Sequence, residues 1–194
     1  MVNYPGSVNK EYKHTINYAN RGMDLEELLN ISNEYYLSIN KAVIYKKPTP
    51  ITISEVKYGN NERVITKGYF RTPSTLDYNG IYKGRYIDFD AKVTKNKTAF
   101  PLQNLHDHQL LHMKRIIEHG GISFLIISIN DEIYYLDGNI IIDFINKNKR
   151  KSIPYEYIKE KGVIINKKIN PRIDYLEIID KIYFKDDDKW IKII

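Results

Sequence analysis

Two acidic residues and a lysine lie close together near the middle of the chain, in a pattern suited to cutting phosphodiester bonds. Asp77 stands upstream of a predicted strand, residues 85–93, which carries Asp90-Ala91-Lys92 near its end. Successive side chains of a strand point to opposite faces, so Asp90 and Lys92 share one face. The apolar residues beside Asp90 face the other way, where they can pack on a core.

These residue types match the needs of Mg²⁺ and of a phosphate. Mg²⁺ prefers oxygen ligands and keeps several waters, so one or two carboxylates suffice, and Asp77 and Asp90 can supply them. A bound metal lowers the pKa of its water and neutralises charge on the phosphate. The Lys92 ammonium suits a phosphate oxygen or the attacking water. Because Asp-x-Lys alone is common, an ordinary solvated ion pair is the alternative.

A longer ordered pattern surrounds these residues. It comprises residues 20–23, 46–50, 74–92, 94–98, 100–109 and 171–175. This pattern resembles the RecU family of bacterial Holliday-junction resolvases, which belongs to the PD-(D/E)xK nuclease superfamily, and the similarity covers nearly the whole chain. The resemblance implies an α/β fold: a restriction-endonuclease-like core with a mixed central sheet flanked by helices, and a projecting β-hairpin stalk.

The resemblance also implies an activity. The expected protein is a homodimeric, Mg²⁺-dependent endonuclease, with Mn²⁺ as a substitute, that makes paired symmetric nicks in four-way DNA junctions during recombination and repair. The resemblance also implies a cytoplasmic location and no membrane partner. The protein partners that it implies are a RecA-type recombinase and the branch-migration machinery. Two alternatives stay open: a non-cleaving junction-binding modulator of the recombinase, and a general nuclease for branched DNA.

Further site residues follow from the resemblance. Thr75 joins Asp77 and Asp90 at the metal, and Gln109 helps to place the water or the metal. Glu26, on a helix predicted over residues 23–38, takes the place of the acidic residue that reaches the metal in related nucleases; an ordinary surface position is its alternative. The family usually has Glu where this chain has Asp90. The shorter acid has less reach, which leaves the rate and the Mg²⁺/Mn²⁺ preference open.

A long hairpin is predicted between the first core strand and Asp77. Residues 51–58 and 63–70 read as extended arms around the turn residues Gly59-Asn60-Asn61. By resemblance this hairpin is the stalk, inserted at about residues 46–75, which enters the open centre of the junction. The residues assigned to DNA contact are Lys57, Arg63, Lys67, Phe70 and Arg71 on the stalk, and Lys95 and Lys97 on the loop after the catalytic strand.

Two aromatic residues end the second arm. Phe70 is expected to stack on exposed bases at the crossover. Tyr69 is expected to anchor the arm to the core instead.

Composition agrees with a DNA-binding domain. The 194 residues suffice for one core, expected over residues 20–194 behind a tail at 1–19, and the formal net charge of +6 favours a polyanionic partner. The chain has no cysteine and therefore no disulfide framework. The basic run at 146–151 can contact a DNA backbone or serve as an exposed linker.

Hydrophobic periodicity predicts the remaining elements. Strands are expected at 42–45, 77–82, 85–93, 122–129 and 133–136, and helices at 106–119, 140–146 and 175–184. Asp107 is the predicted N-cap of the helix at 106–119. His108 and His112 in that helix have zinc-like spacing, but Gln109 stands where a zinc protease needs its glutamate, so a zinc site is not expected.

Overall fold

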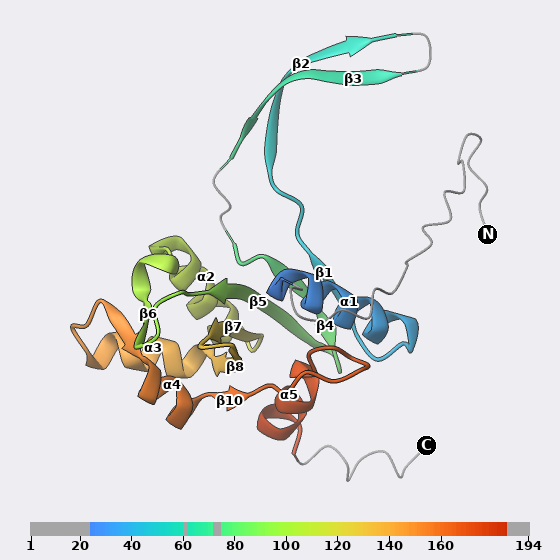
Figure 1. The fold of residues 1–194 in the computed structure, drawn as a ribbon. Coiled ribbons are helices and arrows are strands. Elements are labelled where there is room, and N and C mark those ends of the chain that lie inside the picture. Colours follow the sequence, from blue (N-terminus) through green and yellow to red (C-terminus); the bar gives the residue numbers. More distant parts are fainter. Residues whose placement is uncertain (1–23, 60–61, 72–74, 186–194) are drawn as a thin grey trace.

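The computed structural model describes residues 24–59, 62–71 and 75–185, so the tail predicted at 1–19 lies outside the described residues. A six-stranded mixed sheet runs through the molecule in the order β1-β4-β5-β7-β8-β10 (Figure 1). Its strands are β1 (Val43–Lys46), β4 (Tyr78–Tyr82), β5 (Arg85–Val93), β7 (Ile122–Ile129), β8 (Glu132–Asp137) and β10 (Val163–Ile164). Only the β5–β7 pair of this sheet is parallel.

Helices cover both faces of the sheet. One hydrophobic cluster joins the sheet to α1 (Leu25–Ser38) and α5 (Tyr175–Tyr183). A second cluster joins the opposite face to α2 (Asp107–Glu118), α3 (Gly138–Lys147) and α4 (Tyr155–Lys161). The predicted mixed α/β fold with a central sheet flanked by helices is therefore confirmed. Among the described residues, no helix is long and apolar enough to span a membrane.

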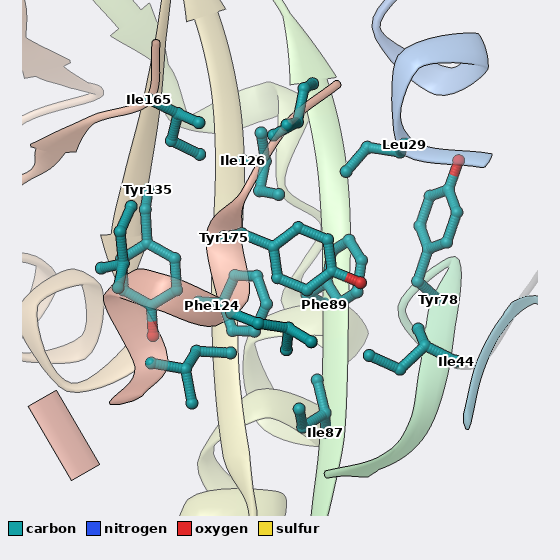
Figure 2. Close-up of a cluster of buried hydrophobic side chains, with 14 of the residues drawn as sticks. Leu29, Ile44, Tyr78, Ile87, Phe89, Phe124, Ile126, Tyr135, Ile165 and Tyr175 are labelled. Atoms are coloured by element: carbon teal, nitrogen blue, oxygen red, sulfur yellow. The ribbon is translucent and has the colours of Figure 1, made fainter. Parts of the chain in front are cut away.

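Stacked aromatic rings pack against the face of β5 that carries Phe89. Phe89 of β5 lies between Tyr78 of β4 and Phe124 of β7, with centroid distances of 4.8 and 4.6 Å and nearly parallel planes. Tyr175 of α5 closes over the same group (Figure 2). Because Phe89 is fully buried in this stack, its neighbour Asp90 must point to the opposite face, under α2.

The stalk is a separate two-stranded sheet that projects far from the core (Figure 1). Its strands, β2 (Ile51–Tyr58) and β3 (Arg63–Phe70), are antiparallel and have the bounds that the sequence predicts. Phe70 is 82% exposed. Tyr69 is 54% exposed and belongs to neither core cluster, so the prediction that it anchors the arm is wrong.

Several short elements escaped prediction. Strands β6 (Ala99–Pro101) and β9 (Ser152–Pro154) form a ribbon of their own, and η1 (Leu102–Asn104) follows β6. The predicted cap of α2 is also wrong, since His106 occupies the N-cap position and Asp107 is the first helical residue. Helix α4 and strand β10 were not predicted either, because their sequences are too short for a periodic signal.

Candidate active site

Strand pairing brings the two predicted metal carboxylates together. Tyr78 of β4 pairs with Phe89 of β5 in an antiparallel register. One step further along the same ladder, Asp77 stands beside Asp90. The Asp77 carboxylate lies close enough to Asp90 to influence its pKa.

The edge strand β1 fixes the other side of Asp77. The Lys47 backbone N–H donates to the Asp77 carbonyl oxygen at 2.7 Å, which continues the β1–β4 ladder. Gly80 permits this close pairing, because a Cβ at that position would lie 2.0 Å from the Val43 carbonyl oxygen. The glycine therefore helps to position Asp77, three residues earlier.

Asp90 is fully buried, and its carboxylate contacts one cationic and one polar side chain. Lys92 Nζ lies 3.0 Å from Asp90 Oδ2, and Gln109 Nε2 donates to the same oxygen at 2.7 Å. The Gln109 side-chain oxygen accepts the His106 backbone N–H at 3.2 Å. Gln109 thus fixes Asp90 to the first turn of α2.

The pKa of the Asp90 carboxyl is raised to about 6. Burial is the main cause, since desolvation penalises the charged form. The nearby Lys92 ammonium opposes the rise, and the Asp77 carboxylate adds to it. The carboxyl is therefore ionised at neutral pH but is close to protonation under mildly acidic conditions.

The donor set fits Mg²⁺. Asp90 Oδ1 is buried without a hydrogen-bond partner among the described residues, although a buried carboxylate oxygen normally has one. A cation would satisfy it and relieve the repulsion from Asp77. In the described part of the chain no group of three or more His, Cys, Asp or Glu side chains could hold a metal. Two carboxylates are what Mg²⁺ ordinarily takes from a protein, with waters completing its coordination.

Thr75 and Glu26 lie around a hollow next to Asp77. This hollow, of about 370 Å³, lies at the root of the stalk, and Lys46 also lines it. Glu26 forms an ion pair with Lys46. The structure thus brings Thr75, Asp77 and Glu26 to one hollow, but the Glu26 carboxylate is engaged with a stalk-root lysine.

Comparison with known proteins agrees with the resemblance in the sequence. The model of the RecU family, described as recombination protein U, matches residues 20–181. The chain belongs to the RecU family. Proteins named Holliday junction resolvase RecU from Bacillus cereus (strain AH820), Bacillus anthracis (strain A0248) and Bacillus thuringiensis (strain Al Hakam) are each 53% identical over 178 residues. Each alignment covers 89% of this chain and 88% of the relative.

One solved structure is also similar. It is Hjc, a Holliday junction resolvase from Archaeoglobus fulgidus, at 8% identity and a TM-score of 0.39, covering 68% of this chain and 93% of that chain.

A second buried carboxylate in this RecU-family site was not predicted. Asp88 is fully buried; it accepts hydrogen bonds from Lys47 Nζ and the Tyr86 hydroxyl, each at 2.7 Å, and lies 3.4 Å from His112 Nε2. The alternation that places Asp90 and Lys92 on one face places Asp88 there too, so that signal was available. Its lysine partner lies 41 residues away and had no local signal.

The predicted DNA-contact residues lie on the surface, apart from the buried site. Lys57, Arg63, Lys67, Phe70 and Arg71 are exposed along the stalk, and Lys95 and Lys97 are exposed on the loop after β5. Arg63 lies over the Tyr58 ring and Lys67 over the Tyr69 ring, at 5.8 and 5.7 Å from the centroids. Their positions suit a long polyanion that contacts the stalk and passes the site.

The raised pKa of Asp90 predicts an acid limit for cleavage. Below pH 6 the carboxyl takes up a proton, and a neutral acid cannot bind a cation well. Because Mg²⁺ and the proton compete for this carboxyl, cleavage at a Mg²⁺ concentration below saturation should fall about tenfold per pH unit below roughly pH 6. Single-turnover rates from pH 5 to 8, with junction binding measured at each pH, test this. A rate that stays level down to pH 5 contradicts it, because only a carboxyl with an ordinary pKa near 4 would remain ionised there.

Asp90→Glu restores the residue usual in the RecU family and should retain or raise the cleavage rate. Its extra methylene gives the carboxylate more reach toward a metal bound at Asp90 Oδ1, which has no hydrogen-bond partner among the described residues. Asp90→Asn, which removes the charge without adding volume, is the matched control and should be inactive. An inactive Asp90→Glu that still binds junctions would mean that the pocket has adapted to the shorter acid.

Proposed function

We propose that this protein is a Mg²⁺-dependent Holliday-junction resolvase, an endonuclease that makes paired symmetric nicks in four-way DNA junctions during recombination and repair. The observation that carries the proposal is the buried Asp90, held by Lys92 and Gln109 beside Asp77, at the root of an exposed basic hairpin. Membership of the RecU family and relatives named as Holliday junction resolvases support it.

The residues have separate roles in this proposal. Asp77 and Asp90, with Thr75, would hold Mg²⁺, which supplies a more acidic water and neutralises charge on the phosphate. Lys92 contacts a phosphate oxygen or the attacking water, where its positive charge counts most as negative charge develops. Gln109 keeps Asp90 in place, and Lys47 keeps Asp77 in place through its backbone.

The assembly follows from the symmetry of the substrate. Two nicks across a junction need two sites, so we infer a homodimer in which each subunit cuts one strand. Each subunit would be one nuclease domain, over residues 20–194, with the stalk inserted at about 46–75. A cytoplasmic location and contacts with a RecA-type recombinase and the branch-migration machinery complete the proposal, and Mn²⁺ is expected to substitute for Mg²⁺.

Cleavage of labelled four-way junctions and of duplexes of equal length, each with and without Mg²⁺, tests the proposal. A resolvase cuts only the junction and only with the metal. Junction binding without product would favour a non-cleaving modulator of the recombinase. Equal cleavage of junction, fork and duplex would favour a general nuclease.

A further inference from the structure

A second hollow lies on the other side of the active site from the stalk. In the sheet, β1 and β4, which carry the stalk root, flank β5 on one side, and β7 and β8 follow on the other. Helix α3 packs on β7 and β8, and its C-terminal connection runs to β9. This connection and β6 lie away from the stalk (Figure 1).

This basic hollow, of about 490 Å³, is formed by residues 101–103 and 105–107 together with Arg150 and Lys151. The Leu102 backbone N–H donates to the Lys151 carbonyl oxygen at 2.9 Å, so the basic loop is fixed to the wall of the hollow. Neither Arg150 nor Lys151 forms an ion pair with any described residue. Asp107 also lines the hollow, but its single negative charge is outnumbered by the two positive charges.

The hollow is joined to the catalytic carboxylate through two hydrogen bonds. His106 lines the hollow, its N–H donates to Gln109, and Gln109 donates to Asp90. The loop that carries Lys95 and Lys97 leads directly into β6, whose last residue, Pro101, lines the hollow. A nucleic acid strand placed at Lys92 would meet these cations as it leaves the site.

We propose that the basic hollow binds the phosphate backbone of a duplex arm, beyond the scissile phosphate and on the side away from the stalk. Arginine presents a planar fork of donors that matches phosphate, and lysine adds a point charge. Such contacts position a duplex without reading its sequence. This inference rests on the proposed cleavage of junctions. It assigns two separate roles in DNA binding: the stalk senses the crossover, and the hollow holds an arm.

The test compares Arg150→Ala/Lys151→Ala with wild type and with the control Lys168→Ala/Lys181→Ala. The control also removes two exposed cations, both paired with Glu177 near α5 on the opposite face of the sheet. For the hollow variant, the slope of log affinity against log salt should fall by about two for each hollow that is engaged, and so by about four for a dimer that holds two arms, with affinity at least roughly tenfold lower at moderate salt. Because an arm is ordinary duplex, the binding of duplex DNA should weaken as well.

Phosphate-ethylation interference on a four-way junction locates the contact. The hollow variant should lose interference on two symmetry-related arms, one for each subunit of the inferred dimer, and keep it at the crossover. An affinity and salt slope equal to those of the control overturn the proposal, as does a loss confined to the junction, which would place the two cations at the crossover. If wild type neither cuts nor prefers junctions, the proposed function fails; if it does both while the hollow variant binds normally, only this inference fails.

Discussion

Asp77→Ala and Lys92→Ala should each lower the rate of junction cleavage by about a hundredfold to a thousandfold. Losses of this size are seen when a group that stabilises charge in a transition state is removed. Asp77 is one of two carboxylates at the site, and Lys92 is the cation 3.0 Å from the other. Neither change removes charge from the exposed stalk, so junction binding should persist. Single-turnover cleavage and gel-shift binding of the same preparations measure the two effects separately.

Matched controls exclude a general effect of losing one charge. Asp143→Ala removes an exposed aspartate of α3 that pairs with Lys147, and Lys114→Ala removes an exposed lysine of α2 that pairs with Glu118. Both should cleave at the wild-type rate. An Asp77→Ala or Lys92→Ala protein that cuts as fast as these controls would show that the catalytic site lies elsewhere.

Shortening the stalk should abolish junction preference and leave the core folded. Ile53 pairs with Gly68, so removing residues 54–67 and joining the ends with Asn-Gly preserves the remaining ladder. A four-way junction differs from duplex mainly in its open centre, and a projecting element is suited to sensing it. Competition of junction against duplex of equal length, at fixed salt, gives the preference. A shortened protein that still prefers junctions would show that the stalk is not the junction sensor.

Phe70→Ala isolates the stacking part of this effect. The ring is 82% exposed at the base of the stalk, where it is available to an unstacked base. Its loss should weaken junction binding by roughly 1–3 kcal/mol, about fivefold to a hundredfold, and duplex binding much less. Ile169→Ala, which truncates an apolar side chain that is 80% exposed outside the stalk, is the control.

Strand β5 and the stalk were predictable because their signals are local. Alternation along β5 places Asp90 and Lys92 on one face, and the turn residues between β2 and β3 define the hairpin. The Asp88 group was missed because its charge is balanced by Lys47, which follows β1 and lies 41 residues away in the sequence. The β6–β9 ribbon was missed for a similar reason, since each strand has three residues and exists through its partner.

The side chain of Glu26 makes a contact that the family resemblance did not predict. Its place on α1 was expected from the sequence, and the structure puts it at the same hollow as Asp77. Its ion pair with Lys46 depends on how the stalk root packs on α1, which no local pattern reveals.

Paired nicking is the central claim, and a supercoiled plasmid that extrudes a cruciform tests it most directly. Two coordinated cuts across the cruciform convert the circle to linear DNA in one binding event, whereas single cuts release the supercoiling and leave a nicked circle. With Mg²⁺ the protein should give linear product without accumulation of nicked circles, and without Mg²⁺ it should give neither. Nicked circles alone, or equal cutting of a plasmid that lacks the inverted repeat, would contradict the proposed resolvase.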